Sequence, residues 1–163
     1  MNDIPTFTLY SNELGGNATL EQVAKECGGE NVSPQLSWIN APKGTKSFAI
    51  TIHDKDAPTG GGFWHWIIFN IPPKIQTIPS GAGDPTKNLI PFGSAQSKND
   101  YGYYGYGGPC PPVGTGDHQY LITIFALDID KLDADKDTLA NEIGFNLWSH
   151  TIKKASIVLY YRR

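Results

Sequence analysis

Apolar and polar residues alternate most regularly over residues 47–54, Ser-Phe-Ala-Ile-Thr-Ile-His-Asp. Phe48, Ile50 and Ile52 share one face there, because successive side chains of an extended chain point to opposite sides. The pattern predicts a strand with one face in a core. Shorter apolar or alternating runs predict further strands at residues 6–10, 36–39, 120–127 and 155–161.

Residues 63–71, Phe-Trp-His-Trp-Ile-Ile-Phe-Asn-Ile, are apolar on both faces. Strict alternation would place His65 on the same face as Ile67, and Trp64 on the same face as Trp66. A run of this kind predicts a central strand that is covered from both sides.

One segment has the period of a helix. Within residues 138–148, Leu139, Ile143 and Leu147 fall on one stripe, and Asp137 is placed to cap the N-terminus. Seven or more strands, long loops and this late helix predict a mostly β protein, an antiparallel β-sandwich with one or two peripheral helices. The 163 residues contain no linker or internal repeat, so we expect a single domain, residues 1–163.

Two stretches are too rich in glycine and proline for long regular elements. Residues 72–100 show no period, and residues 101–120 hold six of the chain's 18 glycines and three of its 12 prolines. Long irregular loops in a compact domain are commonly functional or mobile, and glycine lets backbone amides approach a ligand. Residues 101–120 are therefore expected either to order around a ligand or only to connect strands.

Charge and hydropathy argue against two classes of partner. The formal net charge is −3 and no dense basic run occurs, which argues against nucleic acid. No apolar stretch reaches transmembrane length, and no secretory signal follows Met1. We expect a soluble protein, cytoplasmic if Met1 is native and periplasmic if a signal was removed.

Polar side chains stand at the ends of three predicted strands. Asp54 and Asp56 follow the first, His65 opens the second, and His118 and Tyr120 open the third. Each residue alone is more commonly structural, as a turn aspartate or a core histidine. If the three strands are neighbours, however, the five side chains converge on one site.

Such a set suits an oxyanion such as phosphate. Imidazoles, a phenol and loop amides donate hydrogen bonds, and the two aspartates would orient the imidazoles and favour their protonated form. The alternative is a metal-assisted hydrolase, since two Asp and two His are acceptable ligands of zinc or manganese. We expect no cofactor. No His-x-x-x-His or Cys-pair spacing occurs, which argues against a metal. The chain also lacks a Gly-x-Ser-x-Gly elbow and Cys110 lies between prolines, which argues against a catalytic nucleophile.

Three blocks carry a family resemblance: residues 54–60, Asp-Lys-Asp-Ala-Pro-Thr-Gly; residues 64–72, Trp-His-Trp-Ile-Ile-Phe-Asn-Ile-Pro; and residues 108–120, Gly-Pro-Cys-Pro-Pro-Val-Gly-Thr-Gly-Asp-His-Gln-Tyr. Residues 31–38 and 42–48 match as well. The chain resembles the phosphatidylethanolamine-binding protein family, in its bacterial Raf-kinase-inhibitor-like branch. The resemblance implies a β-sandwich with a small anion pocket at one edge of a central sheet.

The resemblance also implies a binding or inhibitory module rather than an enzyme. Its ligands would be phosphate-bearing head groups or related oxyanions, and some members inhibit kinases or proteases. The implied ligand-binding residues are Asp54, Asp56, His65, Gly108, Pro109, Cys110, His118 and Tyr120. We expect pocket walls from Trp64, Trp66, Pro58 and Tyr106 and the neighbouring tyrosines at positions 101, 103 and 104. A homodimer is compatible with the sequence.

Cys27 and Cys110 are the chain's two cysteines, and the residues alone leave their pairing open. A bridge would close a loop of about eighty residues and stabilise the fold by roughly 4 to 5 kcal/mol in an oxidising compartment. Two unrelated thiols are equally consistent with the sequence. The resemblance favours the disulfide. The chain departs from the family's usual motifs at Lys55, where proline is common, and at Gln119, where arginine is common.

Overall fold

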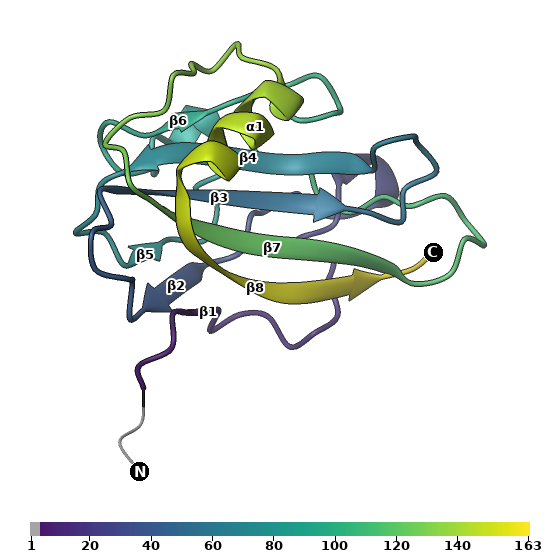
Figure 1. Ribbon diagram of the computed structural model, residues 1–163. Helices are drawn as coiled ribbons and strands as arrows, with labels where there is room; N and C mark the ends of the chain where they lie inside the picture. The colour runs from purple at the N-terminus through teal and green to yellow at the C-terminus, as the bar shows by residue number, and fades with distance from the viewer. Residues whose placement is uncertain (1–3) are drawn as a thin grey trace.

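Two antiparallel sheets organise the computed structural model, which describes residues 4–163 (Figure 1). The larger sheet has the strand order β6-β4-β3-β7-β8 and the smaller sheet has the order β1-β2-β5. The larger sheet contains β3 (Ser47–Asp54), β4 (Phe63–Ile71), β6 (Ala95–Gln96), β7 (His118–Leu127) and β8 (Thr151–Tyr161). The smaller contains β1 (Thr8–Tyr10), β2 (Leu36–Ile39) and β5 (Thr77–Ile78). The predicted mostly β, antiparallel fold is confirmed.

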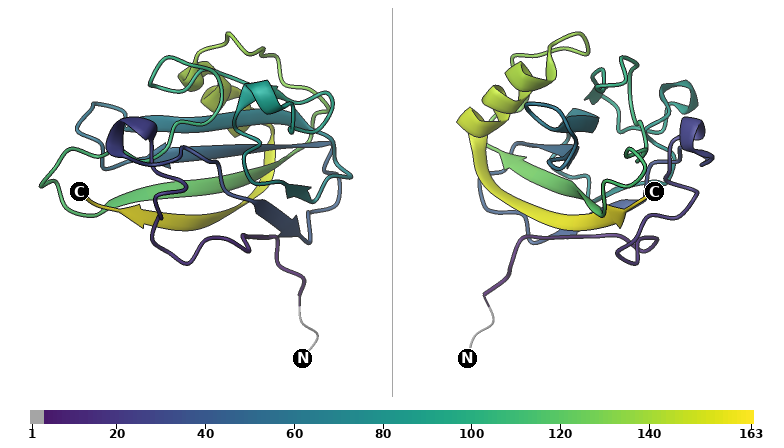
Figure 2. Two further views of the ribbon diagram at one scale, coloured as in Figure 1. Left: turned by 180° about the vertical axis from the view of Figure 1, so that it is seen from behind. Right: turned by 90° about the vertical axis from the view of Figure 1, so that its right-hand side faces the viewer.

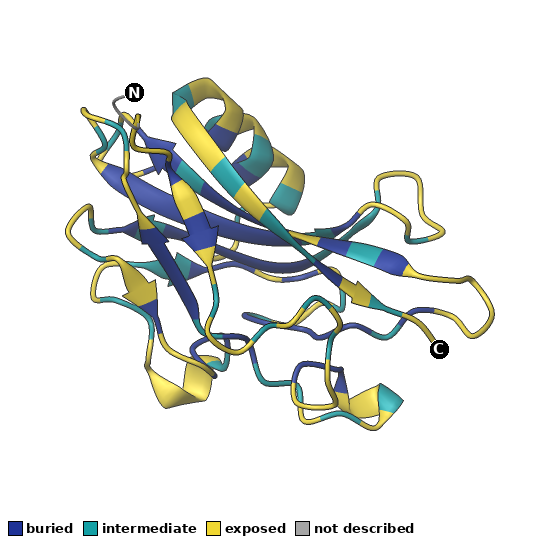
Figure 3. Ribbon diagram, turned by 90° about the horizontal axis from the view of Figure 1, so that it is seen from below, coloured by how far each residue is buried: buried dark blue, intermediate teal, exposed yellow. Residues whose placement is uncertain are grey.

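The larger sheet lies between the smaller sheet on one face and helix α1 (Ala140–His150) on the other (Figure 2). The first core fills the space between the two sheets and includes Phe48, Ile50, Ile52, Ile122, Ile124, Trp38 and Leu36. The second core lies under α1 and includes Ala49, Ile67, Phe69, Leu127, Ile143 and Leu147. Strands β3, β4 and β7 are therefore buried on both faces along most of their length (Figure 3).

Helix α1 occupies the predicted segment but is not capped as predicted. The side chain of Asp137 accepts a hydrogen bond from the hydroxyl of Tyr104 instead of from the helix. The N-cap is Leu139, which makes no side-chain cap bond and is 63% exposed, so it does not join the buried stripe. Ile143 and Leu147 do pack into the second core.

Strand β4 departs from strict alternation at a β-bulge. Ile52 of β3 pairs with Trp66, whereas the next residue of β3 pairs with Trp64, which leaves His65 as the extra residue. Trp66 lies in the first core, and Trp64 packs against the second core. The predicted grouping of Trp64 with Trp66, and of His65 with Ile67, is therefore wrong, because the bulge shifts the alternation by one residue.

The irregular segment at residues 72–100 contains only short elements: β5, a 3₁₀ turn at Pro85–Lys87 and β6. A second 3₁₀ turn, Lys25–Cys27, lies in the loop before β2. Over residues 4–163 no helix combines the length and the apolar character that crossing a membrane requires.

Candidate functional site

A cavity of about 230 Å³ opens where the end of β3 meets the starts of β4 and β7. The strand register sets this convergence: Asp54 at the end of β3 pairs with Phe63 on one side and with Tyr120 on the other. The lining residues are Asp54, Ala57, Pro58, Thr59, Phe63, His65, Tyr101, Cys110, Pro111, Pro112, His118 and Tyr120. The structure thus brings four of the five predicted strand-end residues together.

Asp54 and His118 form a buried hydrogen-bonded pair in the cavity wall. His118 Nδ1 lies 2.7 Å from Asp54 Oδ2. His118 is 1% exposed and Asp54 is 2% exposed. The other ring nitrogen, His118 Nε2, is 2.8 Å from the hydroxyl oxygen of Thr115. Both imidazole nitrogens are engaged by the protein, so the structure does not support the predicted role of His118 as a direct donor to an anion.

Asp56 is the predicted strand-end residue that does not reach the cavity. Its side chain is exposed, and Oδ2 accepts a hydrogen bond of 2.9 Å from the backbone amide of Gln119. Its own amide donates to Asp54 Oδ1 at 2.8 Å. Asp54 therefore orients an imidazole as predicted, whereas Asp56 joins the end of β3 to the start of β7.

His65 is buried against the other wall of the cavity. Its Nδ1 lies 2.6 Å from the carbonyl oxygen of Gly107, and a carbonyl can only accept, so Nδ1 carries a proton. Burial lowers the pKa of His65 to about 4, against the opposing effects of Gly107 and Asp54. The ring is therefore neutral at pH 7, and Nε2 is an acceptor rather than the predicted donor.

Tyr120 and Cys110 supply the hydrogen-bond donors of the cavity. The Tyr120 hydroxyl bonds to no other side chain or carbonyl within residues 4–163, and the residue is 1% exposed. Burial, with a further effect from Asp54, raises the pKa of Tyr120 well above its ordinary value, so the phenol keeps its proton. The backbone amide of Cys110 likewise makes no hydrogen bond inside the described chain.

The walls of the cavity are mainly apolar, but most of them are not the predicted residues. Among the expected wall residues, Pro58 and Tyr101 line the cavity and the other five do not. Trp64 lies on the opposite face of the sheet, Trp66 donates to Gln96 in the first core, and the Tyr106 hydroxyl donates to a backbone carbonyl. The bulge in β4 explains Trp64, and burial in the first core explains Trp66 and Tyr106.

Sequence reasoning missed five lining residues: Ala57, Thr59, Phe63, Pro111 and Pro112. A signal existed for each of them. Phe63 is two positions from His65 and so shares its face, and the ring centroids are 4.8 Å apart. The others are sequence neighbours of residues that had been assigned to the site.

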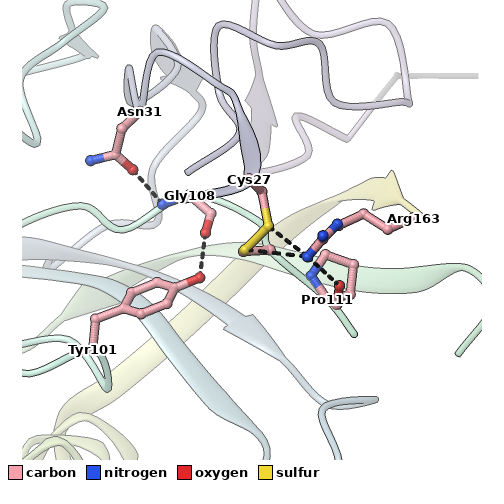
Figure 4. The surroundings of a disulfide bond; sticks show 7 residues. Cys27, Asn31, Tyr101, Gly108, Pro111 and Arg163 are labelled. Carbon is pink, nitrogen blue, oxygen red and sulfur yellow. Dashed lines mark hydrogen bonds between the residues drawn. A yellow bond between two sulfur atoms is a disulfide. The ribbon is translucent and has the colours of Figure 1, made fainter. Parts of the chain in front are cut away.

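Gly108 and Pro109 lie behind the cavity wall rather than in it. The amide of Gly108 donates to Asn31 Oδ1 at 2.7 Å, and its carbonyl accepts from the Tyr101 hydroxyl at 2.8 Å (Figure 4). Pro109 has no N–H, and its carbonyl accepts from Ala24 at 3.0 Å. Of the three loop residues that were predicted to bind a ligand, Cys110 alone lines the cavity.

The disulfide between Cys27 and Cys110 is present, with Cα atoms 5.6 Å apart, within the usual range for such bonds. It joins residues 107–112, the wall segment, to the loop before β2. On its other side, Nη1 of Arg163 lies 2.8 Å from Cys27 Sγ and 3.4 Å from the carbonyl oxygen of Pro111 (Figure 4). The wall segment is thus held from two directions.

No lysine or arginine lines the cavity, and Asp54 is its one carboxylate, among the residues that the structure describes. In the same part of the chain, no three His, Cys, Asp or Glu side chains are grouped so as to hold a metal ion. The cavity therefore offers hydrogen bonds and apolar contact to a ligand, without a lysine or arginine side chain from the described part of the chain.

Comparison with known proteins gives a consistent assignment. The family model for phosphatidylethanolamine-binding protein matches residues 10–162. The chain is 40% identical to YbcL of Escherichia coli K12 over 159 residues, which cover 95% of this chain and 87% of YbcL. It is 41% identical to YbhB of the same organism over 133 residues, 82% of this chain and 83% of YbhB.

Solved structures agree with this result. The crystal structure of E. coli YbcL, described as a new member of the mammalian PEBP family, matches with a TM-score of 0.93 and covers 96% of this chain and 98% of its own. A homologue from Chlamydia trachomatis, CT736, matches with a TM-score of 0.79 at 25% identity and covers 96% and 97% of the two chains. Both share the fold that positions the cavity.

Proposed function

Because the chain belongs to the phosphatidylethanolamine-binding protein family, we propose that its cavity binds a small oxyanion, and in particular the phosphate of a phosphate-bearing molecule. The family assignment supports a ligand-binding fold. The chemistry of the cavity supports the class of ligand. Partners that are nucleic acids are not expected, because the chain lacks a basic surface of the required density.

One observation carries the proposal: Tyr120 lines the cavity, and its hydroxyl keeps its proton and makes no hydrogen bond within residues 4–163. A donor that no protein group uses is free to bond to a ligand oxygen in the cavity. The Cys110 amide offers a second donor nearby in the lining. Pro58, Phe63 and Tyr101 would contact the organic group that the phosphate carries, so we expect aryl or other apolar substituents to be preferred.

Isothermal titration calorimetry with phenyl phosphate tests this proposal on the wild-type chain and on Tyr120→Phe. A hydrogen bond to a charged ligand contributes about 1.5 to 3 kcal/mol, so the variant should bind tenfold or more weakly. Its thermal unfolding should change little, because the hydroxyl has no protein partner to lose. Tyr160→Phe, at an exposed position of β8, is the matched control. Equal affinity of wild type and Tyr120→Phe would contradict the proposal.

Two further expectations stay predictions. The first is that the protein is not an enzyme. The second is that it regulates or inhibits a protein partner, such as a kinase or a protease, which rests on the family resemblance. A pull-down with wild type and Tyr120→Phe would distinguish binding of a partner through the protein surface from binding through the cavity. Recognition through the surface should survive loss of the cavity hydroxyl.

A further inference from the structure

His65 Nε2, in the cavity wall, is a hydrogen-bond acceptor that no protein group within residues 4–163 uses. His65 Nδ1 donates to the Gly107 carbonyl at 2.6 Å, which fixes the tautomer and leaves the lone pair on Nε2. No donor from residues 4–163 reaches that nitrogen, and His65 lines the cavity. A ligand that satisfies Nε2 must therefore bring a proton of its own.

The surroundings of His65 keep its ring neutral. Two carboxylates lie near the ring, Asp54 at the end of β3 and Asp100 in the loop after β6. Both favour protonation of the ring, but burial opposes protonation more strongly. Aromatic rings cover most of the remaining surface: those of Phe63, Tyr101 and Tyr120 have centroids 4.8, 5.7 and 5.0 Å from the imidazole. The remaining titratable group in the lining is His118, which is paired with Asp54.

The charge of the lining also favours a ligand that keeps a proton. Within residues 4–163 no lysine or arginine lies there, and Asp54, 2% exposed, adds a carboxylate at the wall. A doubly charged ligand would therefore lose its hydration without gaining a lysine or arginine partner. A singly charged ligand loses less. A phosphoryl group that keeps one proton combines the lower charge with a P–O–H donor.

We propose, on the basis of the oxyanion-binding function above, that the cavity selects the monoprotonated form of a phosphoryl group. The P–O–H of the ligand donates to His65 Nε2, and another phosphoryl oxygen accepts from the Tyr120 hydroxyl. His65 Nε2 thus offers an acceptor, and the Tyr120 hydroxyl and the Cys110 amide offer donors. The monoprotonated group matches this set, whereas the fully ionised group has no proton for His65 Nε2.

Calorimetry of the wild-type chain with two ligands tests the inference between pH 5 and 8. Phenyl phosphate has a second pKa of about 6, so its monoprotonated fraction, and with it the apparent affinity, should fall roughly 90-fold over that range. Phenylphosphonate has a higher second pKa, so its affinity should fall at a correspondingly higher pH. A shift of the midpoint with the ligand supports the inference. A common midpoint for both ligands would show that a protein group titrates instead, and would overturn it.

A diester provides the matched control. Methyl phenyl phosphate is a monoanion that has no P–O–H, so we expect it to bind at least tenfold more weakly than phenyl phosphate at pH 5, without dependence on pH. Equal binding of the diester and the monoester would overturn the inference while leaving the proposed function intact. If no phosphoryl ligand binds at any pH, the proposed function itself fails.

In His65→Phe, the preference for the monoester over the diester should disappear.

Discussion

Burial sets the charge of three rings around the cavity, those of His65, Tyr101 and Tyr120. His65 loses water on folding and gains one hydrogen bond to a carbonyl, so its pKa falls and the imidazole stays neutral at pH 7. Burial raises the pKa of Tyr101 and of Tyr120, so both phenols keep their protons. His65, which suggested a cationic donor in the sequence, is a neutral group in the folded chain.

The neutral His65 predicts a dependence of stability on pH. Its pKa is 6.5 when unfolded and about 4 when folded, so between these values the unfolded chain binds one more proton. Stability from this group is therefore fully present above about pH 6.5 and is lost as the pH falls towards 4. The loss should reach roughly 3 kcal/mol.

Urea unfolding of wild type and of His65→Gln from pH 4 to 8 measures this effect. The glutamine amide does not titrate and can still donate to the Gly107 carbonyl. The difference in unfolding free energy between the two proteins should change across that window, in the direction of a relative loss for wild type at low pH. Parallel curves for the two proteins would show that His65 does not contribute.

Substitution of Asp54 should lower the stability of the fold, because both of its carboxylate oxygens accept hydrogen bonds. One accepts from His118 Nδ1 and the other from the amide of Asp56. Asp54→Asn replaces one acceptor with an NH₂ group that faces a donor, so we expect destabilisation of about 1.5 to 3 kcal/mol. Denaturant titration measures it. Asp117→Asn, which removes an exposed pair with Arg162, should have little effect; comparable losses in both variants would contradict this account of Asp54.

Strand ends identified the site in the sequence, and a bulge limited how far the details could be predicted. Asp54, His118 and Tyr120 follow simple alternation in β3 and β7, so their convergence could be inferred from the pattern. His65 reaches the cavity only because β4 has one extra residue at that position. An alternating pattern contains no sign of a bulge, so it predicts Trp64 on the same face as Trp66, whereas the structure places them on opposite faces.

The wall segment at residues 107–112 predicts a link between the disulfide and the cavity. The Cys27–Cys110 bridge, with a sequence separation of 83 residues, should contribute about 4.5 kcal/mol on the chain-entropy model. The double variant Cys27→Ala/Cys110→Ala should unfold at a correspondingly lower urea concentration. It should also bind phenyl phosphate more weakly, because Cys110 and the two prolines after it line the cavity.

Intact mass before and after reduction provides the check on the starting material, since a bridged chain gains about two hydrogens. If the folded double variant bound phenyl phosphate as tightly as wild type, the bridge would stabilise the fold without shaping the cavity. That outcome would assign the position of the wall to the Asn31 and Arg163 contacts instead.

The two cores explain why the architecture was predictable and the loops were not. Alternating or two-faced apolar runs marked β2, β3 and β4 with the bounds that the structure has, because both cores are built from those runs. Residues 72–117 hold their conformation through long-range contacts instead. Gly107 donates to the His65 carbonyl, and Tyr106 donates to the Gly83 carbonyl. Contacts of that kind leave no periodic signal in a single sequence.

The same division predicts where a ligand changes the dynamics of the molecule. Strands β3, β4 and β7 carry apolar cores on both faces and pair with neighbours on both edges, so their amides should exchange with solvent only on global unfolding. The segments that line the cavity, residues 57–63 and 107–118, have few ladder hydrogen bonds and should open locally.

Phenyl phosphate should therefore slow hydrogen exchange in those two segments and leave the central strands unchanged. Hydrogen–deuterium exchange with mass spectrometry measures this, and Tyr120→Phe should lose most of the protection at the same ligand concentration. Protection that appeared instead in β1 and β2 would place the ligand on the smaller sheet, because those strands contribute no residue to the cavity.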